Sequence, residues 1–141
     1  MHSYTDYILT QLKALTEIDS PSGYTKEVTD YLISEYENMG YSPKKTVKGG
    51  VLVDLGGTDK ENALLMEAHV DTLGAMVAEI KENGRLRVTP LGGLNANNAE
   101  AENCRIHTRF HGTYEGTMQL TDASIHVNGK YNDTSRTFDV M

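Results

Sequence analysis

The spacing of apolar residues changes near residue 74 of this 141-residue chain, and that change limits the folds open to it. Apolar residues in the first 40 positions recur every three or four residues, as in helices that bury one face. Beyond residue 73 we find no such stripe, and short strand-like stretches are separated by glycines. We therefore expect an α/β part over residues 1–73 and an all-β part over residues 74–141.

Two helices and two strands are expected in the α/β part. The first helical stripe comprises Tyr7, Ile8, Leu12, Leu15 and Ile18. The second comprises Val28, Tyr31, Leu32, Tyr36 and Met39. Ser3 could cap the first helix, and Gly40 suits a left-handed stop after the second. Residues 51–55 and 63–68 are short apolar runs between turn residues, so we expect two largely buried strands.

The all-β part is expected to form a small barrel or sandwich. Asn83-Gly84 is a strong hairpin signal between two arms within residues 76–88, and further strands are expected at residues 104–110, 113–120 and 124–127. Residues 136–141 have the pattern of an entry to another strand. Because two strands would also give the α/β part only a thin core, we expect this chain to be the front part of a longer protein.

Composition excludes several classes of function. The formal net charge is −7 and no cluster of Lys and Arg occurs, which argues against a nucleic-acid partner. No apolar run reaches the roughly 18 residues of a membrane span, and the start lacks the pattern of a signal peptide. A single cysteine, Cys104, cannot form a disulfide framework, so a reducing cytoplasmic location is expected.

The best candidate for chemistry is the pair His69 and Asp71, which follows the apolar run at residues 63–68. Ligands in α/β sheets gather at the carboxyl ends of strands. Side chains two apart in an extended chain point to the same side, so a neutral His69 could bind a metal ion while Asp71 fixes its tautomer. The same two residues could equally mean that His69 only forms a hydrogen bond at the end of a strand and binds no metal. Spacing alone leaves both interpretations open.

Two other groups of residues are weaker candidates for a functional site. Cys104, His107 and His111 superficially match a zinc pattern, but the alternation around them predicts a strand. Cys104 would then face away from His107, and the two histidines would lie about 13 Å apart. Asp122, Ser124 and His126 suggest a catalytic triad, but along a strand each step spans about 7 Å, too far for a hydrogen-bonded relay.

A longer motif surrounds His69, and the chain resembles one known family over nearly its whole length. The similar segments are residues 20–24 (Ser-Pro-Ser-Gly-Tyr), 65–77, 79–86, 91–95, 104–108, 114–117 and 123–127. They resemble the glutamyl aminopeptidase and endoglucanase-like metallopeptidases, the tetrahedral, deblocking aminopeptidases. The resemblance implies the N-terminal part of a zinc-peptidase α/β core, interrupted after Asp71 by an inserted β-barrel domain that helps subunits assemble into a homo-oligomer.

The same resemblance implies the chemistry. Family members remove N-terminal residues from peptides with two divalent metal ions, usually zinc or cobalt. His69 would be a terminal metal ligand, and Asp71 would support that ligand set in the catalytic site. The family's remaining ligands and its general base would lie beyond Met141, so we expect the chain alone to bind no metal tightly and to hydrolyse no peptide. Two alternatives remain open: a non-catalytic self-association module with a vestigial His-x-Asp, and an amidohydrolase relative with the same core.

Overall fold

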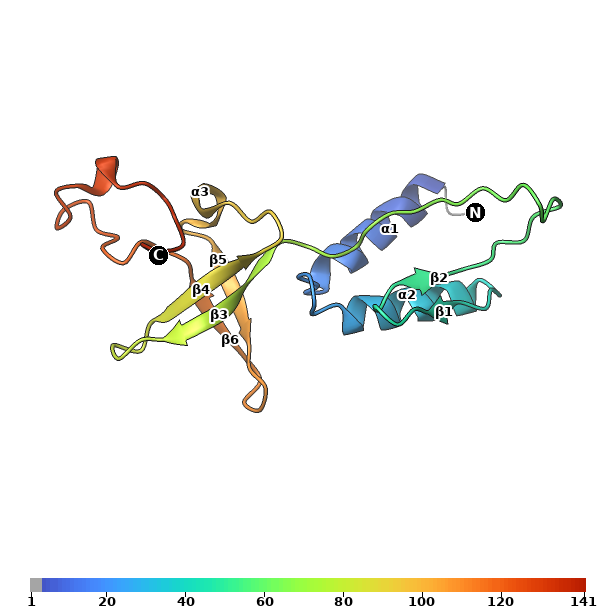
Figure 1. Cartoon of the computed structure of the whole chain (residues 1–141), viewed down its shortest axis with the longest axis horizontal. Helices are drawn as coiled ribbons and strands as arrows, with labels where there is room; N and C mark the ends of the chain where they lie inside the picture. The colour runs from blue at the N-terminus through green and yellow to red at the C-terminus, as the bar shows by residue number, and fades with distance from the viewer. Residues whose placement is uncertain (1–3) are drawn as a thin grey trace. The chain divides into compact units, whose positions relative to one another are not determined.

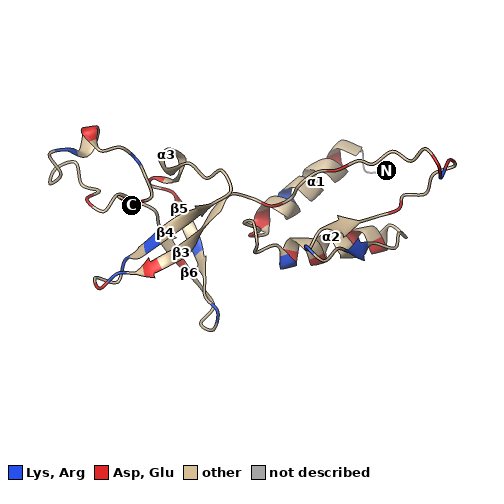
Figure 2. Ribbon diagram, viewed as in Figure 1, with Lys and Arg blue, Asp and Glu red and all other residues tan. Residues whose placement is uncertain are grey.

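The computed structural model describes residues 4–141, and the chain divides into two compact units between Thr72 and Leu73. The chain is a mixture of helices and small antiparallel sheets (Figure 1). Acidic and basic side chains are interspersed along the elements of both units (Figure 2). Within residues 4–141, no helix is long and apolar enough to cross a membrane.

The first unit begins with the two expected helices, α1 (Tyr4–Glu17) and α2 (Lys26–Asn38). Gln11 on α1 lies between two side chains of α2: its Nε2 donates to Glu35 Oε2 at 2.7 Å, and its Oε1 accepts from the Tyr31 hydroxyl at 2.7 Å. The left-handed stop after α2 is confirmed, since Gly40 has a φ of +89°. The expected cap at Ser3 lies outside the described residues.

The strands of the first unit are shorter than the sequence predicts. β1 (Lys44–Lys45) pairs with β2 (Val51–Leu52) in a two-stranded antiparallel sheet, so only the start of the run at residues 51–55 is a strand. The strand expected at residues 63–68 is wrong, because this segment joins no ladder and its apolar side chains at 64–66 are 73–86% exposed. An apolar pattern gives a segment the tendency to be buried, but it cannot supply the neighbouring strand that its backbone must pair with.

The second unit contains two antiparallel hairpins. β3 (Gly74–Ile80) pairs with β4 (Leu86–Leu91) through the turn at Asn83-Gly84, which confirms the expected hairpin; Gly84 has a φ of +81°. β5 (Asn103–His107) pairs with β6 (Thr113–Thr117), close to two of the expected strands. Each hairpin is a separate two-stranded sheet, so the six strands of residues 4–141 do not close into a barrel, and the barrel stays a prediction.

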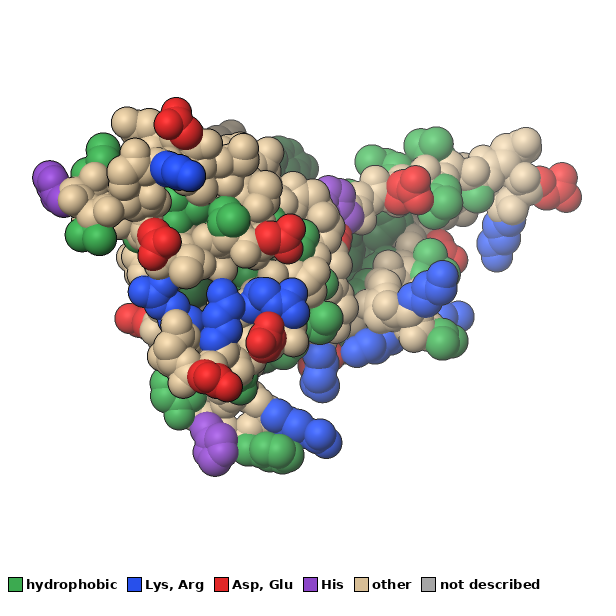
Figure 3. Space-filling model, turned by 60° about the vertical axis from the view of Figure 1, so that its left-hand side comes forward, with side chains coloured by type: hydrophobic (Ala, Val, Ile, Leu, Met, Phe, Trp, Pro, Cys, Tyr) green, Lys and Arg blue, Asp and Glu red, His purple; other side chains and the backbone are tan. Residues whose placement is uncertain are grey.

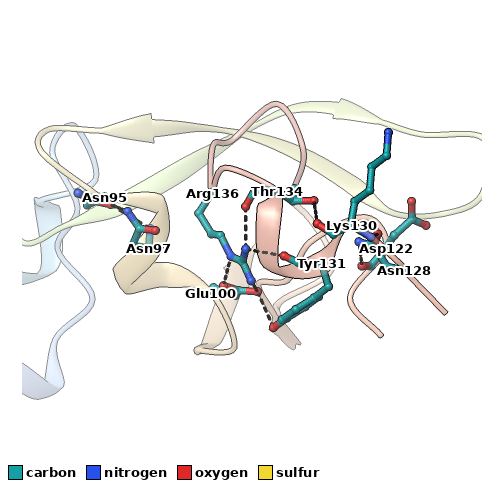
Figure 4. Close-up of polar contacts among 9 residues, drawn as sticks. All are labelled: Asn95, Asn97, Glu100, Asp122, Asn128, Lys130, Tyr131, Thr134 and Arg136. Carbon is teal, nitrogen blue, oxygen red and sulfur yellow. Dashed lines mark hydrogen bonds and ion pairs between the residues drawn. The ribbon is translucent and has the colours of Figure 1, made fainter. Parts of the chain in front are cut away.

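A small core in the second unit involves helix rather than strand alone, which corrects the all-β expectation. α3 (Ala96–Ala99) is capped by Asn95, whose Oδ1 accepts from the Asn97 backbone N–H at 2.9 Å (Figure 4). The buried core residues are Ala96, Ala99, Leu120 and Met141. A helix of four residues is too short to give a periodic stripe, so the apolar pattern could not indicate it.

The segment after β6 is irregular, which makes two further strand predictions wrong. Residues 124–127 join no sheet, and the Val127 N–H donates to the Ser124 carbonyl across a turn; residues 136–141 join no sheet either. The latter segment instead places Phe138, Val140 and Met141 at the α3 core. One short 3-10 helix, η1 (Tyr131–Asp133), lies between them. The apolar side chains of residues 136–141, which the sequence pattern assigned to a strand, are thus packed against α3 instead.

Candidate metal-binding site

The turn between α1 and α2 is fixed by its own backbone. The Tyr24 N–H donates to the Pro21 carbonyl at 2.7 Å, and Gly23 at the third position has a φ of +90°. L-residues with a Cβ rarely adopt that conformation, whereas glycine does so readily. The sequence Pro-Ser-Gly-Tyr therefore closes a tight turn that presents Ser22 at its tip.

This turn lies against residues 70–72, fifty positions further along the chain. The Thr72 N–H donates to the Ser20 carbonyl at 2.9 Å, and Pro21 and Thr72 form a parallel bridge. The Ser20 hydroxyl, which is fully buried, donates to the Val70 carbonyl at 3.0 Å. The turn and the His-x-Asp segment are thus held together within the first unit.

His69 and Asp71 are brought into contact, as expected from their spacing in an extended segment. His69 Nδ1 lies 3.1 Å from Asp71 Oδ1 and 3.2 Å from the Asp71 backbone carbonyl oxygen. A carbonyl oxygen and a carboxylate oxygen can only accept hydrogen bonds. For these contacts to be hydrogen bonds, Nδ1 must carry the ring proton and donate it. The neutral ring then has a free lone pair on Nε2, which is the form in which imidazole binds a metal ion.

Asp71 is also contacted by Ser22. The Ser22 hydroxyl donates to Asp71 Oδ2 at 2.5 Å, so the two carboxylate oxygens have different partners. The hydrogen bond from Ser22 is the largest cause that lowers the pKa of Asp71 below its ordinary value of 3.8; the hydrogen bond from His69 lowers this pKa further, and partial desolvation opposes them. Asp71 is therefore ionised at neutral pH and available as an acceptor.

The imidazole and carboxylate of this site are donor types that suit zinc or cobalt, but they are too few to form a complete metal site. The His69 side chain is 86% exposed, so the ring is not enclosed in the apolar interior and Nε2 is accessible to a ligand. Imidazole with a carboxylate behind it is the usual arrangement at such metals. No group of three or more His, Cys, Asp or Glu able to hold a metal occurs among residues 4–141. The fit is that of one ligand with its supporting carboxylate.

The other two sets of residues are not assembled into a site. Cys104 lies on β5 opposite Gly116 of β6, and His107 Nδ1 is 3.2 Å from the Thr113 hydroxyl at the other end of the strand. The triad-like residues at positions 122, 124 and 126 lie in irregular chain, not on a strand, so the physical reason given against them from strand spacing was wrong.

Ser22 is the site residue that the sequence did not single out. Residues 20–24 contributed only to a family resemblance, because contacts between segments fifty residues apart leave no periodic signal. The available signal was the pair of serines that flank Pro21, two small hydroxyl donors in one turn. Their different partners, a carbonyl for Ser20 and a carboxylate for Ser22, are visible only in the folded chain.

Comparison with known proteins shows the family of the chain. The model of the M42 glutamyl aminopeptidase family matches residues 49–141, a segment that includes His69 and Asp71. The chain belongs to this family, as the resemblance predicted.

Two curated relatives and two solved structures are similar to the chain. YhfE of Bacillus subtilis (strain 168) is 39% identical over 125 residues, which is 89% of this chain and 35% of that protein. Glutamyl aminopeptidase of Lactococcus lactis subsp. cremoris (strain MG1363) is 39% identical over 101 residues, 70% of this chain and 28% of that protein. The chain thus spans about a third of the length of these relatives.

The solved structures agree on the fold. A TET aminopeptidase from the marine sediment archaeon Thaumarchaeota archaeon SCGC AB-539-E09 matches with a TM-score of 0.83 at 23% identity, over 99% of this chain and 38% of that one. PhTET1-12s, described as a dodecamer, matches with a TM-score of 0.66 at 25% identity, over 75% of this chain and 31% of that one.

Proposed function

We propose that this chain forms part of a metal-dependent aminopeptidase that removes N-terminal residues from peptides, with His69 as a metal ligand and Asp71 as the carboxylate that supports it. The observation that carries the proposal is the contact between His69 Nδ1 and Asp71 Oδ1 at 3.1 Å, which leaves Nε2 free. Membership of the M42 glutamyl aminopeptidase family and the name of the Lactococcus relative support the choice of reaction.

Each side chain has a separate task in this proposal. His69 offers one neutral nitrogen, and Asp71 holds the proton on the opposite ring nitrogen and keeps the ring orientation. When bound, the two divalent ions that the family resemblance implies, zinc or cobalt, supply a Lewis acid for the scissile carbonyl and lower the pKa of water. Such a hydrolysis also needs a carboxylate base, and neither His69 nor Ser22 is one, while Asp71 is assigned to the support of His69.

The 141-residue chain by itself is proposed to bind zinc or cobalt only weakly and to hydrolyse no peptide. Residues 4–141 hold one accessible imidazole backed by a carboxylate and no larger group of ligands. Structural and catalytic zinc sites normally need three or four protein ligands. Incubation of the purified chain with either metal and an aminoacyl-anilide is expected to give no turnover above the metal alone, and robust turnover would contradict this part of the proposal.

A chimera tests the aminopeptidase function itself. The matching segment of the Lactococcus glutamyl aminopeptidase is replaced by this chain, and hydrolysis of a glutamyl anilide is measured with added cobalt or zinc. We expect metal-dependent activity that His69→Ala removes, whereas His126→Ala, in the exposed turn segment, retains it. Equal activity of the His69→Ala and unmodified chimeras, at equal oligomeric size, would refute the assigned role of His69.

The second unit is proposed to act as an inserted assembly domain within a cytoplasmic homo-oligomer. Hydrophobic side chains reach the surface in both units (Figure 3), and Phe110 at the β5–β6 hairpin is 77% exposed. The two hairpins also present unpaired strand edges, which favour association. The dodecameric relative supports a homo-oligomer, and sedimentation velocity is expected to show species larger than a monomer. Self-association of an inactive wild-type chimera would favour the alternative, a non-catalytic assembly module.

A further inference from the structure

Ser22 and Ser20 stand in one turn but have different kinds of partner. Ser20 is fully buried and donates to a backbone carbonyl, which is what a residue that packs a turn does. Ser22 donates to the side chain of Asp71, which is 39% exposed. The Ser22 hydroxyl is therefore not needed to satisfy the backbone of its own turn.

The contact of Ser22 limits how the Asp71 carboxylate can rotate. A carboxylate attached through one bond to Cβ can turn freely unless both oxygens have partners, because its terminal torsion is broad. Asp71 Oδ2 accepts from Ser22 at 2.5 Å and Oδ1 faces His69 Nδ1 at 3.1 Å. With Ser22 in place, the plane of the carboxylate is set and Oδ1 is held toward the ring. Ser22 in turn is held by the backbone bonds that tie its turn to Thr72.

We propose that Ser22 is a positioning residue: it orients Asp71 so that His69 carries its proton on Nδ1 and offers Nε2 to a divalent cation. The statement about the cation rests on the proposed function, whereas the statement about the proton position does not. Without the hydroxyl, the Asp71 side chain is free to rotate, and His69 Nδ1 keeps only the Asp71 carbonyl as a fixed acceptor at 3.2 Å. The Nε2–H form of the ring, which cannot bind a metal through Nε2, then becomes more populated.

The position of the imidazole proton is directly measurable in the 141-residue chain. Long-range ¹H–¹⁵N correlation spectra distinguish the two neutral tautomers of each of the five histidines, and His69→Asn identifies the signals of His69. The spectra are recorded at about pH 8.5, above the pKa of about 6.5 of a model imidazole. We expect the Nδ1–H form of His69 in the unmodified chain, a shift toward the Nε2–H form in Ser22→Ala, and recovery in Ser22→Thr, which restores the hydroxyl.

Two control variants separate positioning from general loosening of the turn. Ser20→Ala removes a buried contact of the same turn without touching Asp71, and it is expected to lower thermal stability while His69 keeps its tautomer. Ser124→Ala lies in the second unit and is expected to change neither property. An unchanged tautomer in Ser22→Ala, no recovery in Ser22→Thr, or an equal shift in Ser20→Ala would each overturn the proposal.

A zinc titration, followed through the same His69 signals, tests whether Ser22 affects the binding of a divalent cation. Loss of a group that supports a ligand typically weakens metal binding by about 10–100-fold, so we expect roughly tenfold weaker binding in Ser22→Ala and near-normal binding in Ser22→Thr. Equal zinc affinity in all three chains would overturn the metal part of the proposal. The tautomer of His69 does not depend on catalysis. If Ser22→Ala shifts the tautomer in the 141-residue chain but the chimera carrying the unmodified chain is inactive, the aminopeptidase function is refuted and the role of Ser22 stands.

Discussion

Arg136 Nε donates to Glu100 Oε2 at 2.7 Å, which ties the last segment of the described chain to the end of α3 (Figure 4). The same guanidinium donates to the carbonyls of Tyr131 and Thr134 and lies 4.7 Å from the centre of the Tyr131 ring. The Tyr131 hydroxyl closes the group by donating to Glu100 Oε1. One arginine thus holds η1, the following loop and α3 together.

Substitution of Arg136 is therefore expected to destabilise the second unit. Arg136→Ala removes an ion pair whose side chains are only 16% and 20% exposed, together with two hydrogen bonds to backbone carbonyls. We expect the thermal midpoint to fall by several degrees, measured by circular dichroism. Arg109→Ala is the matched control, because Arg109 contacts only the exposed Phe110 ring among the interactions described for it, and no comparable fall is expected. An equal effect of the two substitutions would contradict this assignment.

The Glu100–Arg136 pair also predicts a dependence on pH. The hydrogen bond from Arg136 is the main cause that lowers the pKa of Glu100 below its ordinary value of 4.5, and desolvation opposes it. A depressed carboxyl pKa stabilises the fold above the unfolded-state pKa, and this contribution is lost as pH falls through the folded-state value. Urea unfolding of the unmodified chain and of Glu100→Gln should thus differ most at neutral pH, and the difference should shrink as the pH falls below the unfolded-state pKa of about 4.3 and through the lower folded-state value. A difference that grew on acidification would oppose the prediction.

Gly23 is expected to be intolerant of a side chain for conformational reasons alone. Its φ is +90°, and no atom lies within 4 Å of the position where a Cβ would stand. Gly23→Ala should therefore cost about 1–2 kcal/mol through backbone strain and not through a clash. Gly57→Ala in the same unit is the control, since Gly57 has no positive φ and an added Cβ would meet only an ordinary contact at 3.7 Å. Equal unfolding free energies of the two variants would show that strain at Gly23 is not limiting.

Leu120 is expected to be the most sensitive apolar position of the second unit. It is 1% exposed and packs in the cluster that contains Ala96, Ala99 and Met141. Leu120→Ala should lower the free energy of unfolding by about 2–5 kcal/mol, because it removes buried methyl groups and leaves a cavity. Val127→Ala, at a side chain that is 85% exposed, should change it by less than about 0.5 kcal/mol. Chemical denaturation of both variants measures the difference.

Local sequence features predicted the elements that depend on neighbours along the chain. Both helices, the glycine stop at Gly40 and the hairpin turn at Asn83-Gly84 follow from periodicity and backbone freedom, and the structure has them. The strands expected at residues 63–68 and 124–127 are absent from the described chain, because a strand needs a partner that no local pattern supplies. The contact of His69 with Asp71 likewise follows from a separation of two residues, whereas that of Ser22 with Asp71 does not.

The sequence by itself determined the two helices, the hairpin at Asn83-Gly84, the family and the His-x-Asp pair, since each depends on residues a few positions apart or on a motif. Only the tertiary structure decided that the Ser-Pro-Ser-Gly turn lies against residues 70–72 and that the final residues pack on α3. Those contacts join segments separated by tens of residues. Their geometry depends on how the intervening chain closes, which side-chain periodicity does not record.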